Sequence, residues 1–184
     1  MLNKLDVYHD LEEMQRYLQD VHHLFGDRNQ ICVTSRAGEE GALQEGIGWL
    51  PEGVTDDDYH VINEPFLGSP IEQILLKLPF RFGRSRLIRL PERSCLTIHW
   101  DDCHRYHYAI QTNPAAYIMF FADTENVTTA RIPADGYIYD MDATRTHTAI
   151  NAGKEERIHL VISGPVDGSI KAGRPLELYP DHQV

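Results

Sequence analysis

Cysteine is scarce in this chain. Cys32, Cys95 and Cys103 are the only three among 184 residues, and no two of them form a CxxC pair. An odd, widely spaced set of this kind argues against a disulfide framework and fits a reducing compartment. Long apolar runs are missing as well, and the first six residues lack the apolar stretch and cleavage site of a signal peptide. We therefore expect a cytoplasmic protein with no membrane partner.

Positive charge is also in short supply. The chain has 17 lysines and arginines against 28 aspartates and glutamates, which gives a net charge of −11. Because phosphate backbones are bound by basic surfaces, nucleic acid is not an expected partner. A local exception is the basic cluster of Arg81, Arg84, Arg86, Arg89 and Arg93. We interpret this cluster as a solvated or carboxylate-paired strand edge, the ordinary setting of such charges.

Linkers, repeats and low-complexity tracts are absent too. A chain of 184 residues with 42% hydrophobic and 24% charged residues is long enough for one globular domain with a full core. We expect a single domain over 1–184. Its parts are a helical and irregular N-terminal part (1–80), a β-rich core (81–165) and a C-terminal tail (166–184). The sequence does not determine the oligomeric state.

A first helix is predicted over residues 11–25. Asp10 and Glu13 have the spacing of a capping box, and apolar residues then recur at helical intervals up to Gly26.

A second, short helix is predicted after Ser69, which is followed by proline at the first helical position. This helix should end before Pro79. Between the two helices, residues 27–68 contain a β-like piece at 30–34 but allow no reliable register.

Short strands are predicted after residue 80, where β-branched and aromatic residues gather in runs separated by turn residues. Helices followed by such strands indicate an α+β fold. We expect a double-stranded β-helix (jelly roll, cupin-like) with the N-terminal helices packed on one sheet. The predicted strands are 86–90, 95–101, 105–111, 116–121, 128–132, 136–140, 146–151 and 156–163.

His99, Trp100 and Asp101 lie at the end of a predicted strand. Because side chains alternate along a strand, His99 and Asp101 project from one face and Trp100 from the other. An imidazole and a carboxylate need one more ligand to form a facial triad for a metal ion, which leaves three octahedral positions open. His147, on another predicted strand, is the best candidate for the third ligand.

Arg157 is predicted to lie beside this triad. Residues 147–163 are interpreted as a hairpin that turns near Ala152, which places Arg157 opposite His147 on the same face. The opposite face carries Ile158, Leu160 and Ile162 and is suited to packing against the helices. A guanidinium binds a carboxylate through two parallel hydrogen bonds, so Arg157 suits an anionic ligand near the metal.

Four motifs carry a resemblance to a known family. They are HWD at 99–101, RYHYAIQTN at 105–113, HTAIN at 147–151 and RIHLVI at 157–162. Together they resemble the aspartyl/asparaginyl β-hydroxylase group of Fe(II)/2-oxoglutarate-dependent oxygenases, which includes bacterial hydroxylases of free proline. The resemblance covers roughly residues 80–163, and the first 68 residues carry no comparable signature.

The resemblance implies a role for each motif residue. His99, Asp101 and His147 would bind Fe(II), and Arg157 would bind the far carboxylate of 2-oxoglutarate. His107 would contact this co-substrate, and Arg105 would lie near the substrate. Some vertebrate members have glycine in place of the aspartate, so Asp101 brings this chain closer to the bacterial amino-acid hydroxylases.

The implied activity is hydroxylation of a C–H bond in an amino acid or in an Asp/Asn-type residue of a peptide. Fe(II), 2-oxoglutarate and O2 would be required, and succinate and CO2 would be released. Two alternatives remain open: a cupin-type metalloenzyme that does not use 2-oxoglutarate, and a cupin-like binding module without turnover. Formation of succinate from 2-oxoglutarate separates the hydroxylase from the cupin-type metalloenzyme, and a binding module would bind ligand without consuming oxygen.

Several other polar residues are given ordinary structural roles. Strand histidines are more often hydrogen-bonded than metal-bound, and a zinc site at Cys95, Cys103 and His104 lacks a fourth ligand. Asn151 is assigned to the hairpin turn or, alternatively, to support of His147. The histidines interpreted as structural are His22, His23, His104 and His159, and Asp140 and Asp142 are interpreted as turn residues.

Overall fold

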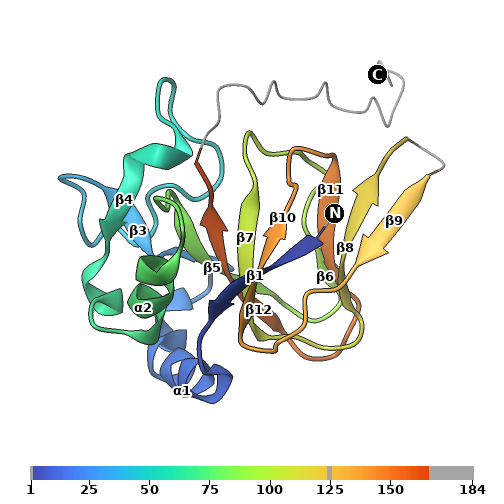
Figure 1. Ribbon diagram of the computed structural model, residues 1–184, viewed down its shortest axis with the longest axis horizontal. Coiled ribbons are helices and arrows are strands. Elements are labelled where there is room, and N and C mark those ends of the chain that lie inside the picture. Colours follow the sequence, from blue (N-terminus) through green and yellow to red (C-terminus); the bar gives the residue numbers. More distant parts are fainter. Residues whose placement is uncertain (1, 124–125, 166–184) are drawn as a thin grey trace.

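The computed structural model describes residues 2–123 and 126–165, and their core is built from two antiparallel sheets that face each other (Figure 1). The six-stranded sheet has the order β1 (Leu2–Tyr8), β10 (Tyr137–Met141), β7 (Arg105–Gln111), β12 (Arg157–Ser163), β5 (Ser85–Leu90) and β2 (Gln30–Cys32). The four-stranded sheet has the order β6 (Ser94–Cys95), β11 (His147–Asn151), β8 (Ala116–Phe121) and β9 (Val127–Ala130). A separate pair is formed by β3 (Thr34–Arg36) and β4 (Tyr59–Ile62).

From β5 to β12 the chain winds between the sheets as a double-stranded β-helix. Strands β5, β7, β10 and β12 lie in the six-stranded sheet, whereas β6, β8, β9 and β11 lie in the four-stranded sheet. Every connection except that from β8 to β9 therefore crosses from one sheet to the other. This alternation is the topology of a jelly roll, as predicted.

Both predicted helices begin at the predicted caps. Asp10 Oδ1 accepts a hydrogen bond of 2.7 Å from the Glu13 amide, and Ser69 Oγ accepts one of 3.3 Å from the Glu72 amide. Satisfying these free amides stabilises the first helical turn. The helices are α1 (Leu11–Val21), which continues as the 3₁₀ turn η1 (His22–Phe25), and α2 (Pro70–Lys77); the short 3₁₀ turns η2 (Asp56–Asp58) and η3 (Glu64–Phe66) lie between them.

The helices cover the outer face of the six-stranded sheet (Figure 1). Met14 and Leu18 of α1 and Ile74 of α2 belong to the same buried cluster as Leu160 and Ile162 of β12. The prediction that one face of residues 157–163 packs against helices is confirmed. Within the described residues, neither helix is long and apolar enough to span a bilayer.

The inner face of the same sheet is partly polar. Arg157 pairs with Leu90 of β5, and His159 pairs with Ala109 of β7. Paired residues on neighbouring strands point to the same face. Because Leu90 and Ala109 pack in the core between the two sheets, Arg157 and His159 also point between the sheets.

The predicted strand over 95–101 is wrong for most of its length. Only Ser94 and Cys95 form a regular strand, and the chain beyond them contacts β11 through hydrogen bonds at Leu96 and an isolated bridge at His99. The amide of Asp101 donates to the Ala143 carbonyl at 2.9 Å instead of continuing a ladder. The segment thus turns away from the four-stranded sheet to reach β7.

The predicted hairpin over 147–163 is also wrong. β11 pairs with β6 and β8, whereas β12 pairs with β5 and β7 in the other sheet. Residues 152–156 cross between the sheets, and the Asn151 amide group fixes this crossing by donating to the carbonyls of Leu90 (3.0 Å), Pro91 (2.9 Å) and Glu155 (2.8 Å). The alternation along β11 and β12 predicts which side chains share a face of each strand. It does not predict which strands pair with them, and this pairing decides the topology.

The description of residues 1–80 as helical and irregular is incomplete. β1 and β2 form the two edges of the six-stranded sheet, and β4 was not predicted. Asp140, interpreted as a turn residue, lies in β10. The predicted tail at 166–184 lies outside the described residues.

Candidate active site

His99 and His147 are held side by side by their own backbones. The His99 amide donates to the His147 carbonyl at 3.0 Å, and the His147 amide donates to the His99 carbonyl at 2.8 Å. Two residues that exchange both bonds stand directly opposite each other and carry their side chains on one face. Accordingly, the two imidazole rings have centroids 4.5 Å apart.

The orientation of both rings is set by nearby carbonyl groups. His99 Nδ1 lies 2.7 Å from the Thr97 carbonyl oxygen, and His147 Nδ1 lies 2.8 Å from the Arg145 carbonyl oxygen. A carbonyl can only accept, so each Nδ1 carries the proton and each Nε2 presents its lone pair. Both Nε2 atoms are therefore prepared to bind a metal ion.

Asp101 supplies an anionic oxygen beside these nitrogens. Its Oδ2 lies 4.0 Å from His99 Nε2 and 3.9 Å from His147 Nε2. Burial by itself raises the pKa of this carboxyl, but the charge of Arg105 and its hydrogen bond to Asp101 hold the pKa below its usual value. Asp101 is thus ionised at neutral pH, as a ligand must be.

The donor set fits a divalent first-row metal ion. One ligand atom from each of His99, Asp101 and His147 lies within 4.8 Å of the others. Two imidazole nitrogens and one carboxylate oxygen on neighbouring segments are the ligands of the non-haem Fe(II) facial triad. Structure and sequence agree that these three side chains meet, although His99 and Asp101 reach the site from an irregular segment and not from a strand.

A second cluster of polar side chains lies deeper between the sheets. Arg157, His107 and His159 are 3%, 5% and 1% exposed. Arg157 Nη2 lies 2.8 Å from His159 Nδ1, and the rings of His107 and His159 meet edge to face at 5.7 Å. Among residues 2–123 and 126–165, no carboxylate pairs with Arg157.

This second cluster contains polar atoms without partners. Both ring nitrogens of His107 and the Nε2 of His159 are buried and form no hydrogen bond within the described part of the chain. Buried polar groups are nearly always satisfied, so orphan atoms next to an unpaired guanidinium are typical of a binding pocket for an anion. We call Arg157, His107 and His159 the anion pocket.

The electrostatics of the anion pocket agree with this interpretation. Burial lowers the pKa of Arg157 to about 9, since no anionic group offsets the loss of solvent. Burial also lowers the pKa of His107 well below its usual value, and the charge of the neighbouring Arg157 lowers it further. His107 is therefore neutral at pH 7.

Arg86 is a buried cation that the sequence did not single out. It is 9% exposed, donates from Nη1 to Gln30 Oε1 at 2.9 Å, and keeps its Nε without a partner in the described residues. Burial, followed by the charges of Arg84 and Arg105, lowers its pKa to about 9. The interpretation of the basic cluster as a solvated edge is wrong at Arg86, because β5 is covered on both faces.

Arg84 departs from that interpretation in a different way. Its Nε lies 2.6 Å from Asp56 Oδ1, and both side chains are 7% exposed. The predicted pairing with a carboxylate is confirmed for Arg84, but the pair is buried and does not lie at a solvated edge.

Arg105 lies between Asp56 and the metal-ligand cluster. Its guanidinium donates to Asp101 Oδ1 at 2.7 Å, to Ser163 Oγ at 2.8 Å and to Cys103 Sγ at 2.7 Å. Burial alone lowers the pKa of Arg105, but the carboxylates of Asp101 and Asp56 raise it above its usual value. The prediction that Arg105 contacts the substrate stays a prediction.

His22, His23 and His104, interpreted as structural, have ordinary hydrogen-bonding or ionic partners. His104 Nδ1 lies 2.7 Å from Asp140 Oδ1, and His22 Nε2 lies 3.0 Å from Glu156 Oε1. His159 differs from them because it belongs to the anion pocket and keeps an unpaired Nε2.

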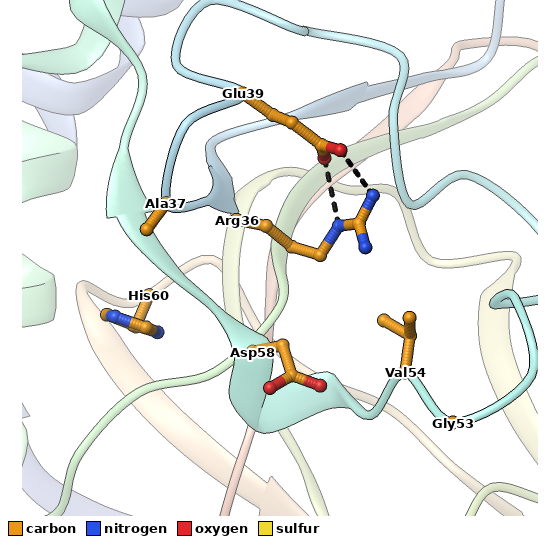
Figure 2. Close-up of a pocket in the computed structure, with 7 residues that line it drawn as sticks. All are labelled: Arg36, Ala37, Glu39, Gly53, Val54, Asp58 and His60. Carbon is orange, nitrogen blue, oxygen red and sulfur yellow. Dashed lines mark hydrogen bonds and ion pairs between the residues drawn. The ribbon is translucent and has the colours of Figure 1, made fainter.

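A hollow near the N-terminal loops is a weaker candidate for a site (Figure 2). Arg36, Glu39, Asp58 and His60 are among its lining residues. The Arg36 guanidinium is already paired with the Glu39 carboxylate, as Figure 2 shows. The main cation of this hollow is therefore neutralised by a carboxylate, whereas Arg157 has no carboxylate partner in the described residues.

No protein-family model matches the sequence, and no curated protein does. Solved structures with some similarity include a prolyl-4-hydroxylase from Pseudomonas putida, at 14% identity over 91% of this chain and 88% of that chain, with a TM-score of 0.48. A 2OG-Fe(II) oxygenase family protein from Burkholderia pseudomallei matches at 13% identity over 53% of this chain and 51% of that chain, with a TM-score of 0.39. A cupin domain from Bordetella pertussis matches at 15% identity over 48% of this chain and 88% of that chain, with a TM-score of 0.38. At these identities and TM-scores, the similarities support no inference about what this chain binds or does.

Proposed function

We propose that the protein is an Fe(II)- and 2-oxoglutarate-dependent hydroxylase. When bound, Fe(II) and 2-oxoglutarate supply the activation of O2, which oxidises a substrate C–H bond to an alcohol while 2-oxoglutarate is converted to succinate and CO2. His99, Asp101 and His147 hold the metal ion in this proposal. Their single-face arrangement leaves the opposite face of the ion open to co-substrate and O2.

The anion pocket binds and orients the co-substrate. Arg157 offers its planar guanidinium to the far carboxylate of 2-oxoglutarate, and the unpaired nitrogens of His107 and His159 provide further polar contacts. Because the pocket lies between the sheets, the bound carboxylate is shielded from water and its pairing with Arg157 is strengthened.

One observation carries this proposal: a buried arginine without an acidic partner in the described residues lies in the same interior as a His–Asp–His cluster. Leaving a guanidinium buried and unpaired costs free energy, and a dicarboxylic acid that also reaches the metal offsets this cost. A structural role for Arg157 does not account for the orphan nitrogens of His107.

The decisive experiment incubates Fe(II)-loaded protein with 2-oxoglutarate in air and measures succinate by mass spectrometry, with no added substrate. Slow uncoupled succinate formation that requires both Fe(II) and 2-oxoglutarate supports the proposal. Metal binding without any succinate would instead favour a cupin-type metalloenzyme that uses no 2-oxoglutarate, or a binding module.

The substrate in this proposal is a free amino acid or an Asp/Asn-type residue in a peptide, as the motif resemblance implies. A panel of amino acids and short peptides, monitored for the mass of one added oxygen atom, tests this part separately. A cytoplasmic location remains a proposal that rests on the sparse cysteines.

A further inference from the structure

The two carboxylate oxygens of Asp101 have different surroundings. Oδ2 faces His99 Nε2 and His147 Nε2 at 4.0 and 3.9 Å. Oδ1 accepts a hydrogen bond of 2.7 Å from Arg105 Nη2. One oxygen is thus directed to the metal-ligand cluster while the other is occupied by an arginine.

The Arg105 guanidinium is itself held on several sides. Nη1 donates to Ser163 Oγ at 2.8 Å and to Cys103 Sγ at 2.7 Å, and Nη2 lies 3.0 Å from Asp56 Oδ2. Its side chain is 4% exposed. A planar guanidinium held at both Nη atoms has each N–H direction fixed, so its Nη2–H fixes the position of the Asp101 oxygen that it contacts.

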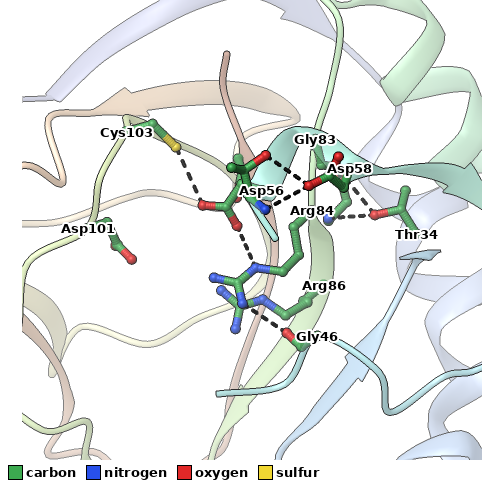
Figure 3. A network of polar contacts seen from close by, with 12 residues as sticks. Thr34, Gly46, Asp56, Asp58, Gly83, Arg84, Arg86, Asp101 and Cys103 are labelled. Atoms are coloured by element: carbon green, nitrogen blue, oxygen red, sulfur yellow. Dashed lines mark hydrogen bonds and ion pairs between the residues drawn. The ribbon is translucent and has the colours of Figure 1, made fainter. Parts of the chain in front are cut away.

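Asp56 anchors this arrangement from a distant part of the sequence. It lies in η2, directly before β4, and its other oxygen lies 2.6 Å from Nε of Arg84, the residue that precedes β5. Figure 3 shows Asp56 joined by dashed lines to Cys103 and to Arg84, with Asp101 drawn beside Cys103. The irregular N-terminal segment is thereby connected to the metal-ligand cluster.

The geometry points to Arg105 as a positioning residue that holds Asp101 as a monodentate metal ligand, with Asp56 as its anchor. A carboxylate that binds through both oxygens takes two of six octahedral positions. With two histidines, only two positions are then left, whereas a chelating 2-oxo acid and O2 together need three. By occupying Oδ1, Arg105 keeps the third position free. This inference rests on the proposed function and goes beyond it by naming what keeps the site open.

The test measures Co2+ binding to the metal-free full-length protein, without 2-oxoglutarate or substrate. Co2+ has affinity for the same nitrogen and oxygen ligands and reports its coordination through visible absorption bands. In Arg105→Lys the charge is kept but the fork is lost. We expect the apparent Kd for Co2+ to rise by about 10- to 100-fold, as is typical when a group that orients a ligand is removed. The absorption bands should change shape, because Asp101 becomes free to bind through both oxygens.

The matched control is Arg84→Lys. Arg84 is also a buried arginine paired with Asp56, but it does not contact Asp101. We expect this variant to lose stability and yet to bind Co2+ with an affinity and spectrum close to those of the parent protein. An equal loss of Co2+ affinity in both lysine variants would mean general loosening of the cluster and would overturn the inference.

Asp56→Asn is the second variant, for the case that Arg105→Lys does not fold. It keeps Arg105 and all three metal ligands but weakens the anchor, so the Co2+ bands should shift in the same sense with a smaller rise in Kd. An unchanged Kd and spectrum in folded Arg105→Lys or, failing that, in Asp56→Asn overturns the positioning role.

Two further outcomes separate this inference from the other proposals. A parent protein that binds no Co2+ overturns the metal site and the proposed function together. If Arg105 only contacts substrate, Arg105→Lys raises the KM for substrate but leaves Co2+ binding unchanged, which overturns the positioning role alone.

Discussion

At the scale of single residues, the metal-ligand cluster is prepared before any ion binds. Each histidine donates a hydrogen bond from Nδ1–H to a carbonyl two residues earlier in the chain, so both rings have a fixed tautomer. Asp101 receives its orientation from a side chain, Arg105, instead. Arg105 is in turn held by Asp56 and Ser163, so the geometry of the carboxylate depends, through Arg105, on residues far away in the sequence.

Asp101→Ala should abolish metal-dependent turnover while the fold survives. The substitution removes the anionic ligand, but the Asp101 amide can still donate to the Ala143 carbonyl and hold the segment. Iron content, succinate formation and thermal unfolding are measured on the same preparation. An iron-loaded variant that still forms succinate would contradict the assignment of this ligand.

Arg157→Ala should chiefly raise the KM for 2-oxoglutarate. Loss of a buried charged partner costs about 2–5 kcal/mol of binding free energy, which corresponds to roughly 30-fold or more in affinity. Steady-state kinetics of succinate formation at varied 2-oxoglutarate provide the measurement.

The control for this prediction is Arg89→Ala. Arg89 is an arginine of the same sheet that pairs with Ile158 and therefore points to the outer face. Its KM should equal that of the parent protein, and an unchanged KM in Arg157→Ala would remove Arg157 from the co-substrate site.

At the scale of elements, helix caps and side-chain alternation predicted the helices and several strands, because these features depend on nearby residues. The caps at Asp10 and Ser69 and the alternation along residues 105–111 and 157–163 gave boundaries close to those of α1, α2, β7 and β12. The segment 95–101 failed, since its backbone donors go to β11 and to Ala143 and not to a regular ladder. A single bridge there brings the two histidines together as well as a full strand would.

Asp10→Ala should destabilise the protein without changing its activity. The substitution leaves the Glu13 amide at the start of α1 without its side-chain acceptor. The expected cost is about 1 kcal/mol, or a decrease in Tm of roughly 2–4 °C for a chain of this length. Differential scanning calorimetry measures the change, and Asp10→Asn, which keeps the acceptor oxygen, should stay close to the parent protein.

At the scale of the whole molecule, the N-terminal segment and the β-core are joined by buried charges. Asp56 contacts Arg84, just before β5, and Arg105 on β7, and the Arg84 guanidinium also donates to the Gly46 carbonyl at 3.0 Å and the Gly48 carbonyl at 3.1 Å. The segment before β4 is thus held to the start of β5 and to β7, which carries His107.

Asp56 should make stability depend on pH in the acid range. Burial raises the pKa of its carboxyl, but Arg105 and Arg84 together hold the pKa below the usual value of 3.8. A carboxyl with a lowered folded-state pKa contributes stability that is fully present above its unfolded pKa and is lost as the pH falls through the folded value. Removing one partner of such a buried pair costs about 3–5 kcal/mol.

Urea unfolding of the parent protein and of Asp56→Asn measures this effect. The difference in unfolding free energy should be constant above about pH 5 and should shrink below the usual carboxyl pKa. A difference that is the same at pH 3 and pH 7 would show that the ionised form of Asp56 is not what stabilises the fold.

The amino-acid sequence was sufficient for the fold class and for both helices, and it named His99, Asp101 and His147, whose ligand atoms the structure brings together. These features depend on short-range physics: helix caps, side-chain alternation and metal-ligand chemistry. His107 and Arg105 were named only through the motif resemblance, and His159 was interpreted as structural.

Only the three-dimensional structure decided which strands are neighbours and what the buried charges contact. The crossing from β11 to β12, the edge strands β1 and β2, and the burial of Arg86 all follow from contacts between segments far apart in the chain. Pairing between distant segments has no local signature, because either sheet satisfies the same alternation. The contact of Asp56 with Arg105, and through it with Asp101, is of this kind, so no pattern within residues 27–68 could have predicted it.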